Sequence, residues 1–250
     1  MNDRALGLRP LTARSVVLST LLGSHPPRLP VQSLIRVGGL FGIAEGTVRV
    51  ALSRMTADGD LLPVDGTYEL TARLLARQHD QDETRSPATR TWRGRWDVVI
   101  IDRTVRPGAG KTALLGALGT LRLAQLRDGV WLRPDNLVRP WPPSLPAPVT
   151  HLRAMPLDDA VGMARRLWPL EKWTTYASAL LAAMADAGDP ARRFALSAAV
   201  LRHLRTDPLL PPALEPPEWP GRHLRREYSR FEADLGRLLR SPMDDHPGLD

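Results

Sequence analysis

Residues 31–71 carry two helical patterns and a hairpin pattern without a gap, and this order restricts the fold more than any other stretch of the chain. In the second helical pattern the apolar residues are spaced three or four positions apart, at Val48, Ala51, Leu52 and Met55. Because an α-helix has 3.6 residues per turn, this spacing places them on one face. We expect that face to be buried.

A shorter helical pattern precedes it, with apolar residues at Val31, Leu34, Ile35 and Phe41. Pro30 can open this helix, and Gly42 stands where a left-handed C-terminal cap would end it. Two helices joined by a short turn that contains glycine form a helix-turn-helix. A further helix is predicted from Ala13 to Leu22, ended by Gly23, as the third helix of the same domain.

A hairpin pattern follows the second helix, which Gly59 closes. The strand-like runs Leu61–Val64 and Thr67–Leu70 flank Asp65 and Gly66. A two-residue Asp-Gly connection favours a hairpin strongly, because both central residues must adopt positive φ. Helix, turn, helix and hairpin in this order predict a winged helix.

The outward side of the second helix is lined by small residues with two arginines at its edges: Gly46, Thr47, Arg49, Val50, Ser53, Arg54 and Ala57. Small side chains permit a helix to approach the floor of a DNA major groove, and arginine reaches guanine edges or phosphates. The predicted DNA contacts are therefore Thr47, Arg49, Val50, Ser53 and Arg54, with the hairpin turn of Asp65, Gly66 and Thr67 adding backbone contacts.

The composition is compatible with this interpretation and excludes several enzyme classes. A formal charge of +7 favours an anionic partner, although nearly all the basic residues are arginine, as a GC-rich coding bias also produces. With no cysteine there is no disulfide, thiolate metal site or cysteine nucleophile. We expect a cytoplasmic protein, because no uncharged apolar run is long enough to cross a membrane and no signal peptide pattern is present.

Beyond the hairpin, a helix is predicted over 72–81 and a polar linker over 82–91. A central α+β segment follows, with a buried strand at Trp96–Ile101, a helical pattern over 109–126 and a strand at Gly129–Leu132. Thr150–Arg153 and the helix-like Asp158–Leu167 complete it. From Trp168 the pattern is mostly helical, apart from the proline-rich stretch 209–221.

Three segments resemble the PaaX family of bacterial transcriptional repressors. The most specific is LFGIAEGTVRVALSRMTADGDLLP followed by YELT, and the others are GVWLRPDNL and PPALEPPEWPG. The resemblance implies an N-terminal winged helix, a central domain similar to the ferredoxin-like fold of Cas2 nucleases, and a helical C-terminal domain. It also implies release from DNA by an acyl-CoA effector.

The sequence departs from the pattern of that family at the start of the second helix and in the wing. Ala44 stands where the family often has serine or asparagine, so the helix lacks an N-cap oxygen, at a cost of about 1 kcal/mol. The predicted wing carries Asp65, Gly66 and Thr67 where the family commonly has arginine. An acidic wing repels phosphate.

The sequence gives only weak evidence for a catalytic site. The run from Arg106 to Thr112 resembles a P-loop but has Val105 where that motif needs glycine. Asp102 ends the first central strand, where Cas2 nucleases place a metal-binding aspartate, whereas Asp97 falls on the opposite pleat. One carboxylate does not hold a catalytic Mg²⁺ without a second acid or substrate phosphates. The six histidines show no metal-ligand spacing, so no metal or cofactor is expected.

We interpret the chain as an α+β transcriptional regulator, specifically a repressor, and not as an enzyme. The expected domains are a DNA-binding winged helix over 1–82, a ferredoxin-like domain over 92–167 and a helical domain for dimerisation or effector binding over 168–250. The expected partners are double-stranded operator DNA, an acyl-CoA effector and a second copy of the chain. Trp92, Trp96 and Trp131 are predicted to meet around the central sheet, chiefly as core. The alternatives are a metal-dependent nuclease centred on Asp102 and a winged helix that binds protein.

Overall fold

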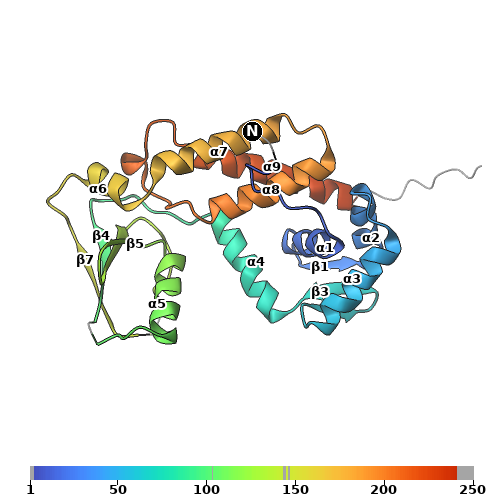
Figure 1. Cartoon of the computed structure of the whole chain (residues 1–250), viewed down its shortest axis with the longest axis horizontal. Coiled ribbons are helices and arrows are strands. Elements are labelled where there is room, and N and C mark those ends of the chain that lie inside the picture. Colours follow the sequence, from blue (N-terminus) through green and yellow to red (C-terminus); the bar gives the residue numbers. More distant parts are fainter. Residues whose placement is uncertain (1–2, 103, 143–144, 146, 241–250) are drawn as a thin grey trace, which may run out of the picture. The chain divides into compact units, whose positions relative to one another are not determined.

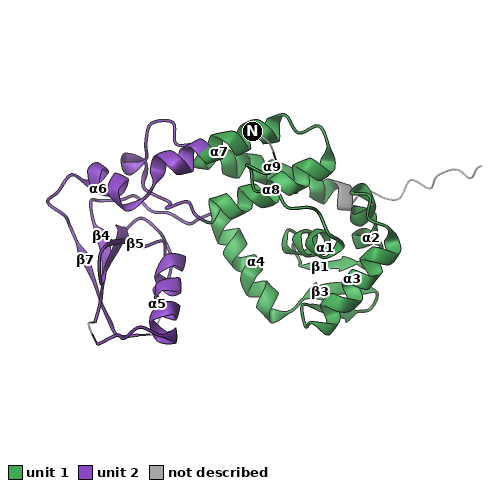
Figure 2. Cartoon of the chain, in the orientation of Figure 1, with its two compact units in different colours: residues 1–85, 176–205, 221–250 green, residues 86–175, 206–220 purple. Residues whose placement is uncertain are grey.

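The computed structural model describes residues 3–102, 104–142, 145 and 147–240 and is a mixed α+β fold with two antiparallel sheets. It forms two compact units (Figures 1 and 2). Unit 1 comprises the described residues of Met1–Arg85, Tyr176–Arg205 and Gly221–Asp250, and unit 2 those of Ser86–Thr175 and Thr206–Pro220. The three predicted domains stay a prediction, because compactness does not show which segment folds on its own.

The N-terminal part of unit 1 contains the helices and hairpin that the sequence predicts, with the bounds α1 Ala13–Leu22, α2 Val31–Leu40, α3 Glu45–Ala57, β2 Leu61–Val64 and β3 Thr67–Leu70. Thr12 and Ser15 form a capping box at the start of α1, and Gly23 ends it. Ala44 at the N-cap of α3 makes no side-chain cap, as expected.

Positive φ angles occur at the turns where the sequence requires them. Gly42 has φ +68° after α2, and Gly59 has φ +71° after α3. Asp65 and Gly66, at φ +44° and +74°, form the two-residue hairpin connection between β2 and β3. This φ pair is the one that joins twisted strands without splaying them, so the hairpin register follows from the turn.

One strand of this sheet was not predicted from the sequence. The strand β1, Arg28–Pro30, pairs antiparallel with β3, so that the sheet has the order β1-β3-β2. Its three residues are too few for a periodic signal, and its partner lies far along the chain. Proline is tolerated there because β1 is an edge strand.

The core of this part of unit 1 is built around the apolar face of α3. Val48, Leu52 and Met55 are almost fully buried, whereas Ala51 is half-buried. They pack with buried residues of the neighbouring elements: Val17, Leu21, Leu22, Leu34, Leu61, Leu70 and Leu74. The helices of the predicted helix-turn-helix come very close together at Gly38, where an added Cβ would lie 2.6 Å from Val48 Cγ2.

We predict opposite effects of the same substitution at two adjacent glycines of α2. Gly38→Ala should destabilise the protein by about 1–2 kcal/mol, since overpacking costs about 1–3 kcal/mol and outweighs the gain in helix propensity. Gly39→Ala should leave stability unchanged or raise it by up to about 1 kcal/mol, because no atom lies within 4 Å of its added Cβ. Urea denaturation of both variants measures this. Equal effects would contradict the close helix contact.

Four longer helices complete this region and its connections, namely α4 Ala72–Arg85, α7 Leu170–Ala185, α8 Pro190–Leu204 and α9 Gly221–Arg240. The prediction that α4 ends at Gln81 is wrong by four residues. Arg85 forms ion pairs with Asp82 and with Glu232 of α9, so the polar residues assigned to a linker continue the helix and join it to α9. The helical interpretation of the C-terminal third is confirmed.

The sheet of unit 2 has the strand order β5-β6-β4-β7 with every pair antiparallel. Its strands are β4 Trp96–Ile101, β5 Ala124–Arg127, β6 Val130–Pro134 and β7 Val149–Ala154. Its helices are α5 Ala109–Thr120 and α6 Ala160–Leu167, and a short 3-10 helix, η1, spans Pro212–Leu214.

The predicted helix over 109–126 is too long, because α5 ends at Thr120 and β5 begins at Ala124. Arg122 has φ +62°, a left-handed conformation that ends a helix. Leu121 and Leu123 are nevertheless buried. The apolar pattern therefore runs through the turn, and the sequence could not separate helix from strand there.

The predicted grouping of three tryptophans is also wrong. Trp92 and Trp96 do meet, with ring centroids 6.4 Å apart, and Trp168 stacks on Trp96. Trp131 instead packs with the cluster of Val99 and Leu114, a different core from that of Trp96. Trp131 lies opposite Val99, three residues along β4 from Trp96. Because side chains alternate along a strand, Trp96 and Trp131 lie on opposite faces of the sheet.

Candidate nucleic-acid interface

The outward face of α3 is open in the structure. Every side chain that the sequence assigns to the reading surface is exposed: Thr47, Arg49, Val50, Ser53 and Arg54. Val50 is the largest apolar group among them and is 51% exposed. Val48, Leu52 and Met55 are buried on the opposite side of the helix. They fix this orientation, because only one rotation of α3 about its axis buries all three.

The two arginines of this face differ in their partners. Arg49 donates from Nε to Glu45 Oε1 over 2.8 Å, and its Nη2 lies 2.7 Å from the same oxygen. The Arg54 side chain makes no hydrogen bond or ion pair with any residue that the structure describes. Arg54 is therefore ready to bind an anion, whereas Arg49 must first leave Glu45.

The hairpin turn lies next to a positive charge that the sequence did not predict. Asp65 and Gly66 are exposed, and Thr67 is half-buried. Arg28, on β1, donates to Thr67 Oγ1 over 2.9 Å and pairs with Glu69 at 3.2 Å. The absence of arginine from the hairpin is thus offset by one from the neighbouring strand. Only the pairing of β1 with β3 could have indicated this.

A cluster of charged residues holds the C-terminal end of α3. Asp60, directly after the turn that ends α3, is 2% exposed and pairs with Arg14 of α1 and Arg73 of α4. Asp58 pairs with Arg14 at 2.9 Å but is itself exposed. One buried carboxylate therefore connects α1, α3 and α4, and helps to fix the angle at which α3 is presented.

We predict that Asp60→Ala lowers the free energy of unfolding by about 2 kcal/mol, because hydrogen bonds to a buried charged group are lost. The guanidinium groups of Arg14 and Arg73 remain hydrated, since their side chains are 48% and 68% exposed. Asp58→Ala is the matched control and should cost less than about 1 kcal/mol, as exposed pairs do. Chemical denaturation compares the two. Similar losses would contradict a structural role for Asp60.

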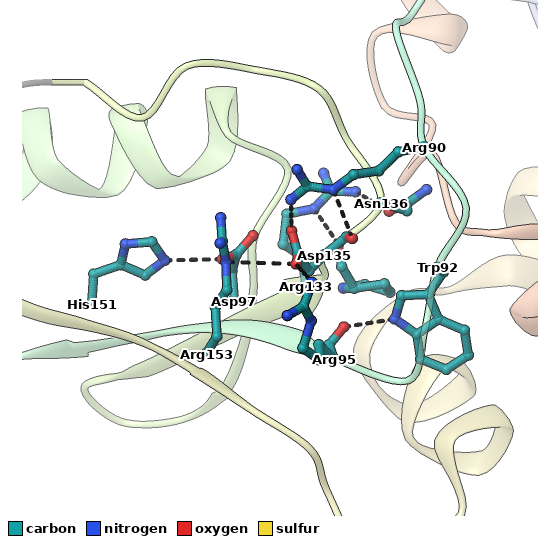
Figure 3. Close-up of polar contacts among 10 residues, drawn as sticks. Arg90, Trp92, Arg95, Asp97, Arg133, Asp135, Asn136, His151 and Arg153 are labelled. Carbon is teal, nitrogen blue, oxygen red and sulfur yellow. Dashed lines mark hydrogen bonds and ion pairs between the residues drawn. The ribbon is translucent and has the colours of Figure 1, made fainter.

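Unit 2 contains a second polar cluster, which Figure 3 shows. Asp97 Oδ1 lies 3.0 Å from Arg153 Nε and 3.1 Å from His151 Nε2. Asp135, 3% exposed, pairs with Arg90 and lies 3.5 Å from Arg153 Nε. This cluster connects β4, β7 and the end of β6, so Asp97 has a structural role and is not an open metal ligand.

Arg133 is the most deeply buried cation of the same cluster. It donates to Asn136 Oδ1 over 2.8 Å and to the Pro134 carbonyl over 2.9 Å, and Asn136 Nδ2 donates to the Leu209 carbonyl over 2.9 Å. Burial lowers the pKa of Arg133 to about 9, which still leaves the side chain charged at neutral pH. These bonds attach the proline-rich segment to the sheet.

Asp102, the centre of the nuclease alternative, lies exposed just after β4. Its carboxylate accepts a hydrogen bond of 2.8 Å from the Thr104 backbone N–H, and this bond lowers the pKa of Asp102. Within the described part of the chain, no three histidine, aspartate or glutamate side chains are grouped so as to hold a metal ion. Gly108 is the N-cap of α5, so the P-loop-like run from Arg106 to Thr112 ends in the first turn of that helix.

Comparison with known proteins identifies the N-terminal part of the chain. Residues 12–74 match the family model of PaaX-like proteins, so this part of the chain is PaaX-like. This family is known for transcriptional regulation. The matched residues span α1 to the start of α4, the part that carries the candidate interface.

A solved structure is similar over almost the whole chain. It is that of an uncharacterized protein, Rv0674, from Mycobacterium tuberculosis, with 43% sequence identity and a TM-score of 0.82, covering 92% of this chain and 98% of that one. No curated protein matches the chain. Of the helices in the described residues, none is long and apolar enough to span a membrane.

Proposed function

We propose that the protein is a DNA-binding transcriptional repressor that inserts α3 into the major groove of an operator. The observation that carries the proposal is the outward face of α3, where small residues surround an arginine without a protein partner. Thr47, Val50 and Ser53 leave room for close approach, and Arg54 reaches a base edge or phosphate. The match of the N-terminal part to a regulator family supports the same function.

The finer architecture belongs to the proposal. The order of α2, α3 and the β2–β3 hairpin supports a winged helix, with Arg28 as a phosphate contact beside the turn of Asp65, Gly66 and Thr67. In unit 2, the antiparallel order β5-β6-β4-β7 supports a ferredoxin-like sheet. Such a sheet has a helix in its second crossover, yet α6 follows β7, so the likeness is limited to the strands and α5.

We predict that Arg54→Ala weakens operator binding by about 1–3 kcal/mol, the range for loss of a base contact. Arg49→Ala should have a smaller effect, since breaking the Glu45 pair offsets part of what this arginine gains on DNA. Retardation of DNA from upstream of the gene gives both affinities. Arg226→Ala is the control, because this arginine of α9 is exposed, lies outside α3, and makes no side-chain hydrogen bond or ion pair with a described residue.

Graded salt in the same assay tests whether phosphates are contacted at all. The logarithm of the binding constant should fall linearly with the logarithm of salt concentration. A winged helix that binds protein would give no retardation, and unchanged affinity in both Arg54→Ala and Arg49→Ala would remove α3 as the reading helix.

The repressor is proposed to act as a two-fold dimer through its C-terminal helices, because palindromic operators match two-fold proteins. Its release is proposed to follow binding of an acyl-CoA thioester. We predict that phenylacetyl-CoA or a related thioester raises the protein concentration needed for half retardation at least tenfold, whereas free coenzyme A does not. Retardation by wild-type protein with each compound measures this, and equal effects of the two would contradict a thioester effector.

A further inference from the structure

Unit 1 contains a pocket of about 760 Å³, and Arg28 is the one residue of its wall that is also proposed to contact DNA. Its walls come from α1, from the segment that includes β1, and from α4, α8 and α9, all within this unit. The volume falls in the range of about 300–1,000 Å³ typical of small-molecule sites. The pocket is therefore large enough for a ligand with several functional groups.

The charge of the pocket wall is strongly positive. Five arginines line it, namely Arg9, Arg28, Arg77, Arg202 and Arg205, against one acidic residue, Glu232. That carboxylate already forms an ion pair with Arg85, a residue outside the lining. The wall therefore offers no free carboxylate to balance its guanidinium groups.

Two pairs of these arginines repel each other. Burial, and then the charge of Arg205, lower the pKa of Arg77, although Asp60 acts in the opposite direction. Burial and the charge of Arg9 lower the pKa of Arg202, and Tyr176 acts in the opposite direction. Arg77 and Arg205 form no hydrogen bond or ion pair with a described residue, and Arg202 donates only to the Gly7 carbonyl, over 2.9 Å. Folding alone gains nothing from such pairs, whereas a bound anion relieves their repulsion.

The remaining wall is apolar. Phe194 and Phe231 are buried, with ring centroids 6.0 Å apart, and Leu18, Leu201 and Leu235 lie beside them along the lining. A small inorganic anion would leave this apolar surface in contact with water. The wall therefore favours a molecule in which an apolar or aromatic group adjoins its negative charges.

We propose that this pocket binds a small molecule that carries at least two negative charges next to a compact apolar group. The guanidinium groups of Arg77 and Arg205 hold the anionic part, and the wall that contains Phe194 and Phe231 holds the apolar part. This site is separate from the outward face of α3.

The pocket wall is continuous with the proposed reading elements, which gives the ligand a route to regulate them. Leu29 lines the pocket and lies opposite Tyr68 of β3, and α2 begins at Val31, directly after β1. The Val31 backbone N–H donates to the Gly66 carbonyl in the hairpin turn over 3.1 Å. A ligand that prefers one spacing between β1 and α8 therefore biases the hairpin and α2. This regulatory part rests on the proposed function, whereas the binding site does not.

The test uses the full chain and 1-naphthyl phosphate, a dianion with a two-ring apolar group, in titration calorimetry without DNA. We expect saturable binding at least tenfold tighter than that of 1-naphthol or inorganic phosphate, because each of these fills only one part of the site. Arg77→Gln and Arg205→Gln should each weaken binding at least fivefold. Arg226→Gln, the matched control outside the pocket, should change it less than twofold.

The unfolding temperature of each variant distinguishes an arginine that binds ligand from one that stabilises the fold. Without ligand, Arg77→Gln and Arg205→Gln should unfold at the same or a higher temperature than the wild type, since each removes a repulsion. Absence of binding, binding unchanged in both variants, or an equal loss in Arg226→Gln would overturn the site. Retardation assays with and without 1-naphthyl phosphate then test regulation, and an unchanged midpoint would overturn that part alone. If the protein binds the dianion but not DNA, the proposed function is refuted while the proposed binding site is still supported.

Discussion

The packing of one narrow apolar stripe on α3 determines which side chains this protein presents outward. Val48, Leu52 and Met55 are buried among residues of α1, α2 and the hairpin, so the opposite side of the helix cannot also be covered by its neighbours. Burying side chains of this size contributes about 1.5–3 kcal/mol each. Rotation of α3 by even one residue would expose part of that surface, and this cost fixes the direction of Arg54 and Ser53.

Polar groups then set the angle of α3 more finely than the apolar core can. Hydrophobic contact is not directional, whereas the bonds of Asp60 to Arg14 and Arg73 require particular positions of α1 and α4. Unit 2 shows the same combination of apolar and polar contacts. Two apolar clusters form most of its core. The hydrogen bonds of Arg133 and Asn136 attach the proline-rich segment at one place. In both units a buried charge specifies geometry that apolar burial leaves open.

The sequence predicted correctly those helix ends and turns that depend on residues close together in the chain. The hairpin at Asp65-Gly66 and the ends of α1 were predicted to the residue, because turn and cap chemistry depend on neighbours in the chain. The prediction missed β1 and ended α4 too early, because both depend on distant partners: β1 on β3, and the last turn of α4 on Glu232. For the same reason the sequence indicated the exposed face of α3 but neither Arg28 beside the hairpin nor the pocket walled by α8 and α9.

The basic residues illustrate why composition alone could not locate function. Nearly all are arginine, so no arginine stands out in the sequence, and only contacts separate their roles. Arg14, Arg73 and Arg85 pair with carboxylates inside unit 1 and stabilise it. Arg77 lies near the like charge of Arg205, and burial together with that charge lowers its pKa against the opposing influence of Asp60. A like-charged pair of this kind does not stabilise the fold, so a bound anion explains it better than folding does.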